Sequence, residues 1–340
     1  MKTSVLIIYT GGTIGMKTDL RTGALVPFDF SGIYDEFPSL KRLDIDLEVM
    51  TLPPIDSSNV SPHDWTKIAR IIRDNYHRHD GFVVLHGTDT MSYTASALSF
   101  MLRNLAKPVI FTGSQIPIGV LRTDGRENLI TAIEIAGARR TDGSPEISEV
   151  ALYFQNRLFR ANRTTKISAE ALNAFRSYNY PPLAEVGVNI DYNRGAVLRP
   201  NGKPLQTATD FNTNVMVLKL FPGIGEQALR GMLSLDRVEG IVLETFGAGN
   251  APTAEWFVSA VSEAVDAGKI VLNVTQCPDG TVEMGMYETG LALQRAGVLC
   301  GHDITTEAAV AKMMYVLGIE HDRKRRIALL NESICGEFTA

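Results

Sequence analysis

Short apolar runs that each end in a glycine-bearing turn are the feature that most constrains the fold of this 340-residue chain. Over the first two-thirds of the sequence these runs alternate with longer amphipathic stretches, a pattern typical of buried parallel strands joined by helices. We expect strands at Val5–Tyr9, Phe82–His86, Val109–Thr112 and Val150–Phe154, and helices at Trp65–Tyr76, Tyr93–Leu105 and Leu129–Ala138. The sequence therefore predicts an α/β fold with a larger N-terminal domain, in which helices flank a mainly parallel sheet.

The alternation stops between Tyr180 and Asn214, where Pro, Gly and Asn surround isolated apolar residues, and it resumes at Val215. Such composition is typical of a linker or a peripheral hairpin between domains. We predict an N-terminal domain at residues 1–190, which carries the candidate site, a linker at 191–213, and a smaller C-terminal α/β domain at 214–340. In the last of these we expect strands at 215–220, 240–244 and 270–274, and helices at 226–233, at 254–267, from Leu291 and from Thr306.

Composition excludes several classes of protein. A hydrophobic fraction of 45% gives ample material for one large or two medium domains, and a net charge of -5 offers no electrostatic footprint for nucleic acid or anionic lipid. The first apolar run, Val5–Tyr9, is too short for a signal sequence or a membrane span. The cysteines, Cys277, Cys300 and Cys335, are odd in number and lack metal-ligand spacing, so we expect neither disulfides nor zinc and predict a cytoplasmic protein.

The first glycine-bearing turn, Thr10–Gly15, has neither the spacing of a dinucleotide-binding loop nor the lysine of a P-loop. Thr10 and Thr13 flank glycines whose backbone N–H groups a ligand can approach closely. Acyl transfer needs such a combination of a hydroxyl nucleophile with donors for an oxyanion. A tight turn without chemical role is the alternative.

Two further turns, His86–Thr90 and Thr112–Gln115, also follow predicted strands, and in open α/β sheets ligands bind beyond the carboxyl ends of the strands. Asp89 is suited either to cap the next helix or to hold a substrate ammonium group. His86 is expected to be packed and hydrogen bonded rather than catalytic. Lys166, if it is drawn into the same crevice, would lose proton affinity by desolvation and serve as a base for a hydroxyl group.

Six motifs, in this order and spacing, resemble the bacterial L-asparaginases, most closely the cytoplasmic type I branch. They are Thr10–Ile14, Asp56–Ser58, Leu85–Thr90, Thr112–Gln115, Asn162–Lys166 and Gly247–Pro252. The resemblance spans nearly the whole chain. It implies hydrolysis of L-asparagine to L-aspartate and ammonia without a metal or organic cofactor, by a homodimer or homotetramer.

The resemblance also implies roles for individual residues. Thr13 would attack the amide carbon and form a β-aspartyl ester, which water then hydrolyses. Thr88, Asp89 and Lys166 would form a second catalytic group in which Lys166 moves protons. The implied substrate contacts are Ser57 to the α-carboxylate with Ser58 beside it, Asp89 to the α-ammonium, Thr88, Ser114, and Asn250 from a neighbouring subunit.

Two positions depart from the family pattern. Where relatives carry a tyrosine on the loop after the nucleophile, this chain has Ala24. Either other groups activate Thr13, or Tyr34 or Tyr287 takes the place of that tyrosine.

The second departure concerns allostery. Some type I relatives bind asparagine at a second site, for which Thr165, Glu244 and Cys277 are the matching candidate residues. Because Glu244 replaces an arginine and would repel the effector's carboxylate, we expect allosteric activation to be absent or altered.

Three other functions deserve comparison. A glutaminase-asparaginase is hard to separate, because one methylene changes the free energy of discrimination by only about 1 to 3 kcal/mol. An amidotransferase subunit acting with transfer RNA normally carries an extra N-terminal domain, and the acidic balance here does not support RNA binding. A non-catalytic amino-acid-binding protein would need Ser57 and Asp89 but neither Thr13 nor Lys166.

Overall fold

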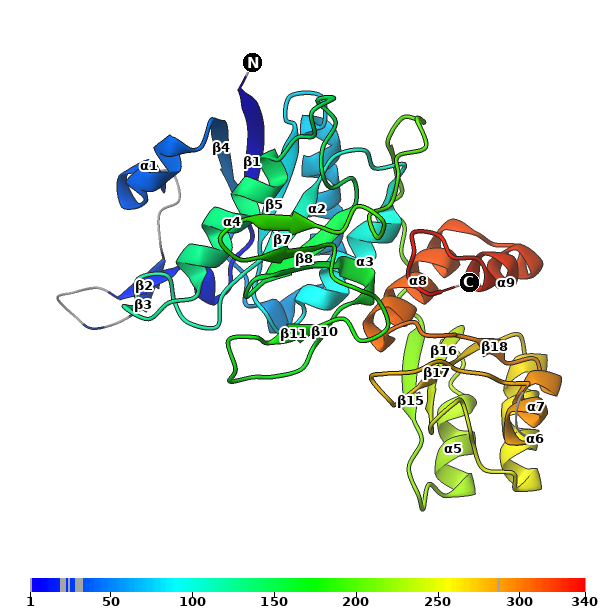
Figure 1. The fold of residues 1–340 in the computed structure, drawn as a ribbon. Coiled ribbons are helices and arrows are strands. Elements are labelled where there is room, and N and C mark those ends of the chain that lie inside the picture. The colour runs from blue at the N-terminus through cyan, green and yellow to red at the C-terminus, as the bar shows by residue number, and fades with distance from the viewer. Residues whose placement is uncertain (1, 19–22, 24, 28–32, 286–287, 340) are drawn as a thin grey trace. The chain divides into compact units, whose positions relative to one another are not determined.

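The computed structural model describes residues 2–18, 23, 25–27, 33–285 and 288–339. The chain divides into two compact units, Met1–Thr209 and Asp210–Ala340 (Figure 1). The first contains a large sheet with helices and the second a smaller parallel sheet with helices, so the predicted α/β class is confirmed. Among the described residues, no helix has the length and apolar content that crossing a membrane would require.

The main sheet of the N-terminal unit has eight strands in the described residues, in the order β13-β12-β9-β8-β7-β5-β1-β4. Five neighbours, β8, β7, β5, β1 and β4, are parallel, and β9, β12 and β13 extend the sheet antiparallel. The bounds are β1 (Thr3–Tyr9), β4 (Ile45–Thr51), β5 (Gly81–Leu85), β7 (Val109–Thr112), β8 (Val150–Phe154), β9 (Arg157–Arg160), β12 (Ala184–Val186) and β13 (Ile190–Tyr192).

Helices bury both faces of the parallel strands, which explains the continuous apolar runs. Helix α4 (Gly125–Gly137) packs against β1, β5 and β7, and Val83 lies in the same core cluster. Side chains alternate along a strand, so Phe82 points to the opposite face, where it stacks on Tyr76 at the end of α2 (Pro62–Asn75). A capping box formed by Ser61 and Asp64 begins α2. Helix α3 (Met91–Met101) packs against β8.

Short elements complete the N-terminal unit. They are η1 (Thr13–Gly15), β2 (Met16–Thr18), β3 (Leu25–Pro27), α1 (Ile33–Glu36), η3 (Pro38–Arg42), η4 (Ser57–Asn59), β6 (Leu102–Arg103), η5 (Ala161–Arg163), β10 (Thr165–Lys166), β11 (Phe175–Arg176) and β14 (Gln206–Thr207).

Most of the stretch 191–213 lies with the N-terminal unit. Ala196 and Val197 are buried in its core, and β14 pairs with β6. Burial of these isolated apolar side chains ties the stretch to the larger sheet, and the two units meet after Thr209.

The C-terminal unit has a four-stranded parallel sheet in the order β15-β16-β17-β18. Helix α8 packs against β15, β16 and β17, and α5 packs against α6. The bounds are β15 (Val215–Lys219), α5 (Glu226–Leu233), β16 (Gly240–Thr245), α6 (Glu255–Asp266), β17 (Ile270–Thr275), α7 (Glu288–Arg295), β18 (Leu299–Cys300), α8 (Thr306–Ile319) and α9 (Arg323–Asn331). Helix α7 begins before the expected start at Leu291.

Candidate active site

The turns after β1 and β5 contact each other through their glycines. The two strands are parallel with Tyr9 opposite Leu85, so both turns emerge at the same edge of the sheet. A Cβ atom built on Gly12, which has a φ of 85°, would lie 2.4 Å from the Cα atom of Gly87. Only glycine tolerates both that conformation and that approach. This contact places Thr13, the first residue of η1, beside the turn that carries Thr88.

The loop after β4 brings Ser57 to the same place. A Cβ atom on Gly87 would lie 2.6 Å from Ser57 Oγ, and this oxygen accepts a hydrogen bond from the Asp89 N–H at 3.3 Å. The Thr90 hydroxyl donates to the Ser57 carbonyl at 2.7 Å. Ser57 is only 4% exposed, so its position is fixed by the β5 turn.

Ser58 is exposed but already engaged. Its N–H and its hydroxyl both donate to Asp56 Oδ1, at 2.9 and 2.7 Å. These bonds lower the pKa of the Asp56 carboxyl group. The Ser58 hydroxyl therefore lies next to Ser57 in the chain, but its proton points to Asp56.

Lys166, on β10, joins Thr88 and Asp89. Its ammonium group donates to Thr88 Oγ1 at 2.8 Å and to Asp89 Oδ1 at 2.7 Å. The Lys166 side chain is 17% exposed and that of Asp89 is 65% exposed. Thr90, not Asp89, occupies the N-cap position of α3, so capping is not the role of Asp89. The structure thus unites a hydroxyl, an ammonium and a carboxylate group that remains open to a ligand.

Gln115 belongs to this cluster, although the sequence did not single it out as a site residue. The Thr88 hydroxyl donates to Gln115 Oε1 at 3.1 Å, and Gln115 Nε2 donates to the Ala171 carbonyl at 3.3 Å. Gln115 therefore connects Thr88 to the segment that follows β10. Its place in the Thr112–Gln115 turn at the shared sheet edge was the available signal.

Ser114 is placed differently from the expected substrate contact. It is 1% exposed, and its hydroxyl is enclosed without a hydrogen-bond partner in the part of the chain that the structure describes. Asp124 holds the turn in place by accepting bonds from the N–H groups of Gln115 and Ile116, both at 3.0 Å. The Ser114 side chain therefore faces the interior of the unit.

His86 is packed and hydrogen bonded, as expected. Nδ1 lies 2.7 Å from the Gly87 carbonyl, and Nε2 lies 3.0 Å from the Thr94 hydroxyl, which accepts a bond from Trp65. Burial lowers the pKa of His86 to about 4, so the ring is neutral at neutral pH. Because a carbonyl can only accept, Nδ1 carries the proton, and its bond to Gly87 fixes the backbone of the turn that carries Thr88.

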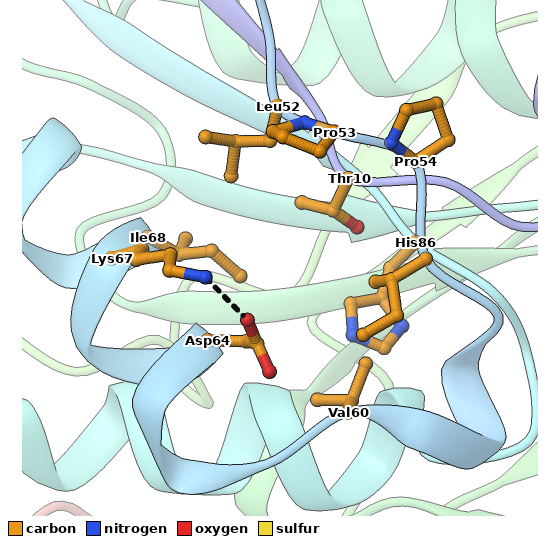
Figure 2. Close-up of a pocket in the computed structure, with 10 residues that line it drawn as sticks. Thr10, Leu52, Pro53, Pro54, Val60, Asp64, Lys67, Ile68 and His86 are labelled. Carbon is orange, nitrogen blue, oxygen red and sulfur yellow. Dashed lines mark hydrogen bonds and ion pairs between the residues drawn. The ribbon is translucent and has the colours of Figure 1, made fainter.

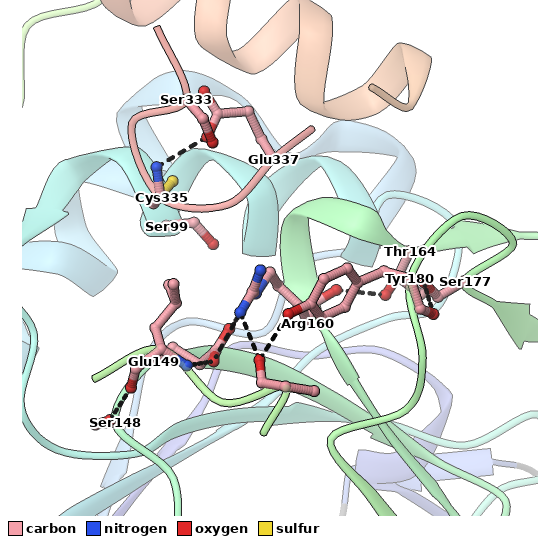
Figure 3. A network of polar contacts seen from close by, with 12 residues as sticks. Ser99, Ser148, Glu149, Arg160, Thr164, Ser177, Tyr180, Ser333, Cys335 and Glu337 are labelled. Atoms are coloured by element: carbon pink, nitrogen blue, oxygen red, sulfur yellow. Dashed lines mark hydrogen bonds and ion pairs between the residues drawn. The ribbon is translucent and has the colours of Figure 1, made fainter. Parts of the chain in front are cut away.

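A buried ion pair anchors the segment that leads to Lys166 (Figure 3). Arg160 Nε donates to Glu149 Oε2 at 2.6 Å, and the two side chains are 5% and 4% exposed. Arg160 also donates to the Ala196 carbonyl at 2.8 Å, lies over the ring of Tyr180, and precedes η5. The Thr164 hydroxyl donates back to the Arg160 carbonyl at 2.7 Å. These contacts fix the backbone just before β10.

The remaining predicted residues of the C-terminal unit have local partners. Asn250 closes a turn in which its N–H donates to the Phe246 carbonyl at 2.7 Å. Glu244 is 13% exposed, accepts a bond from the Thr306 hydroxyl at 2.6 Å and lies 3.6 Å from Lys219 Nζ. Cys277 is exposed.

Four predicted residues concern the loop after the nucleophile and the effector site. Thr165 lies in the N-terminal unit, on β10 next to Lys166. Ala24 and Tyr287 fall outside the described residues. The Tyr34 hydroxyl is hydrogen bonded to the backbone of β4, where it accepts from the Leu47 N–H at 3.3 Å.

Comparison with known proteins identifies the family. Residues 4–198 match the asparaginase N-terminal domain, and residues 214–330 match the glutaminase/asparaginase C-terminal domain. L-asparaginase 1 of Escherichia coli K12 is 42% identical, over 99% of this chain and 98% of the relative. The crystal structure of L-asparaginase I from Vibrio cholerae matches with a TM-score of 0.91 and 40% identity, over 100% of both chains. The thermostable L-asparaginase from Thermococcus kodakarensis matches with a TM-score of 0.88 and 32% identity, over 99% of this chain and 100% of that one. The chain therefore belongs to the asparaginase family of amidohydrolases.

Proposed function

We propose that this protein hydrolyses L-asparagine to L-aspartate and ammonia, with Thr13 as the nucleophile. The observation that carries this proposal is the contact between Gly12 and Gly87, which sets the Thr13 turn against the turn whose Thr88 is bonded to Lys166. The family match and the relatives named L-asparaginase support asparagine as the substrate.

Substrate binding follows from the charges around the turns. The Asp89 carboxylate is 65% exposed and suits the α-ammonium group of asparagine, while Ser57 lies beside it for the α-carboxylate. An asparagine held by both groups would present its side-chain amide to Thr13. Ser58 and the backbone of the Ser114 turn would complete the contacts.

The reaction proceeds in two steps. Thr13 Oγ attacks the amide carbon, and backbone N–H groups near Thr13 and Thr88 stabilise the oxyanion, each by roughly 3 kcal/mol. The C–N bond breaks and ammonia leaves with the proton that it needs, which forms a β-aspartyl ester on Thr13. Water then attacks the ester, releases aspartate and restores the hydroxyl.

Lys166 is best suited to hold and deliver that proton. Its ammonium group already donates to Thr88 Oγ1, which in turn directs its own proton to Gln115. We therefore assign Lys166 and Thr88 as the relay that protonates the leaving amine, after which the proton from Thr13 recharges the relay. Among the described residues the Thr13 hydroxyl has no hydrogen-bond partner, so its own proton acceptor would be set by substrate binding.

We further propose a cytoplasmic homodimer or homotetramer in which Asn250 completes the site of a neighbouring subunit. The three free cysteines agree with a reducing compartment. Mixing Thr13→Ala and Asn250→Ala subunits tests the arrangement: activity that exceeds either variant alone supports a shared site. Its absence in a mixed oligomer contradicts it.

Ammonia release across a concentration series of L-asparagine, with L-glutamine in parallel, tests the function itself. We expect turnover of asparagine and little of glutamine. Thr13→Ala should abolish turnover and retain asparagine binding. Unchanged turnover in that variant would refute the assignment of the nucleophile.

A further inference from the structure

A cavity lies behind the turns of the candidate active site (Figure 2). It has a volume of about 230 Å³, is partly open to solvent, and is lined by the loop Leu52–Ile55, by the first turns of α2 including Ile68, and by Val60. Thr10 and His86 also line it. No residue proposed above as catalytic or substrate-binding lines it, so the cavity is separate from the asparagine site.

The backbone N–H groups and the hydroxyl that line this cavity at Leu52, Ile55 and Thr10 are already used as donors. The N–H groups of Leu52 and Ile55 donate to the carbonyls of Tyr9 and Thr10, at 2.9 and 3.0 Å, and the two prolines between them have no N–H. The Thr10 hydroxyl donates to the Leu85 carbonyl at 2.9 Å. A polar ligand would therefore find few groups to bond with, whereas the leucine, proline, valine and isoleucine side chains offer apolar contact.

The charged residues at the cavity neutralise each other. Lys67 Nζ lies 2.9 Å from Asp64 Oδ1, and the two side chains are 46% and 21% exposed. Since neither charge is left without a partner, the lining favours a neutral occupant over an ion.

Two residues that line the cavity, Ile55 and His86, also contact the turns of the proposed active site. Ile55 directly precedes Asp56 and Ser57, and a Cβ atom on Gly11 would lie 2.3 Å from the Ile55 carbonyl oxygen. His86 donates from Nδ1 to the Gly87 carbonyl at 2.7 Å. A molecule that presses on Ile55 and His86 therefore contacts residues that hold the substrate-binding turns in place.

We propose that this cavity binds a small neutral apolar molecule the size of a single ring, and that its occupation changes the affinity of the enzyme for asparagine. A closed apolar cavity of about 150 Å³ is large enough for benzene or xenon, so the space suffices. The effect should fall on KM rather than on kcat, because Ile55 lines the cavity and leads directly into Asp56 and Ser57, whereas neither Thr88 nor Lys166 lines it.

Two probes test binding and coupling separately. Xenon applied under pressure to crystals should appear between Leu52, Val60 and Ile68, a result that does not depend on the proposed activity. Benzene should raise the thermal unfolding midpoint and change KM for asparagine at least twofold, with kcat unchanged. Absence of xenon from the cavity, or a KM that does not respond while benzene binds there, would overturn the proposal.

Variants in the cavity sharpen the test. Ile68→Phe and, independently, Leu52→Phe fill the space without touching a catalytic group, so each should keep the basal kcat while losing the response to benzene. Ile68→Val leaves the space open and should keep the response. A benzene effect that persists in both filled variants would place the binding site elsewhere and refute the proposal.

Discussion

Two ion pairs of the N-terminal unit have nearly equal N–O distances but differ in how far their side chains are exposed to solvent. Lys166–Asp89 measures 2.7 Å with side chains 17% and 65% exposed, and Arg160–Glu149 measures 2.6 Å with side chains 5% and 4% exposed. The buried pair is surrounded by fixed partners, among them the Ala196 carbonyl and the Leu198 N–H. The open pair leaves a carboxylate toward solvent, where a ligand can replace water. Exposure to solvent, rather than distance, distinguishes the carboxylate that we propose binds substrate from the ion pair that holds the backbone.

Replacing the open lysine should affect catalysis far more than folding. In Lys166→Met we expect kcat for asparagine to fall about 10³-fold, because the proton relay is lost. The free energy of unfolding should change by less than about 1 kcal/mol, since the Asp89 carboxylate of this pair is largely exposed to solvent. Ammonia release and urea denaturation measure the two effects. Lys67→Met, which removes an exposed pair of 2.9 Å with Asp64, is the matched control and should leave kcat within twofold; a kcat within tenfold of wild type in Lys166→Met would contradict the role.

Breaking the buried pair should have the opposite result. Glu149→Gln leaves the Arg160 guanidinium buried without its counter-charge, which we expect to lower the free energy of unfolding by about 3 to 5 kcal/mol. At a temperature where the variant remains folded, kcat should stay within about threefold. Glu185→Gln on the neighbouring strand removes an exposed partner of Arg157 and should cost less than about 1 kcal/mol. If Glu149→Gln and Glu185→Gln lowered the free energy of unfolding equally, burial would not explain the difference between the ion pairs.

A third prediction concerns acid. The folded-state pKa of His86 is about 4, below the usual 6.5, so the unfolded chain binds more protons between these values. Stability should therefore fall as pH falls from 6.5 to 4, with His86 contributing about 3 kcal/mol. When the free energy of unfolding is measured at several pH values in this range, it should depend less on pH in His86→Gln than in the wild type. Burial also lowers the pKa of His79, which adds loss of the same sign in both proteins; parallel profiles would argue against a neutral, buried His86.

The smallest effect on the asparagine saturation curve is expected at Glu244. Its side chain is 13% exposed, which is between the exposures of Glu149 and Asp89 in the two ion pairs. Its carboxylate accepts a bond from Thr306 and lies near Lys219, and we expect its charge to repel the carboxylate of an asparagine effector. Asparagine saturation should be hyperbolic, and Cys277→Ser should leave the curve unchanged. A sigmoidal curve that Cys277→Ser abolishes would show that the allosteric site survives.

The elements that could be predicted from the sequence are those that leave a pattern in their own residues. Strands β1, β5, β7 and β8 were predicted because burial on both faces produces continuous apolar runs. Strands β12 and β13 are three residues each in a stretch rich in Gly, Pro and Asn, and β12 gains its place by pairing with β9. That pairing depends on tertiary contacts that no local pattern records.

The site shows the same division. The Thr10–Gly15, His86–Thr90 and Thr112–Gln115 turns were found because each follows a recognisable strand. The role of Gln115 depends on a bond to Ala171 from a distant loop, and the enclosure of Ser114 depends on packing. Whether Asp89 caps α3 or faces Lys166 likewise required the structure, because both roles suit a carboxylate at a strand end.

The central claim, that Thr13 carries the acyl group, is tested most directly by mass spectrometry of enzyme that is acid-quenched during turnover of asparagine. The peptide containing Thr13 should gain the mass of an aspartyl group, and this adduct should disappear in Thr13→Ala. An aspartyl adduct on Thr88, or full turnover by Thr13→Ala, would contradict the account.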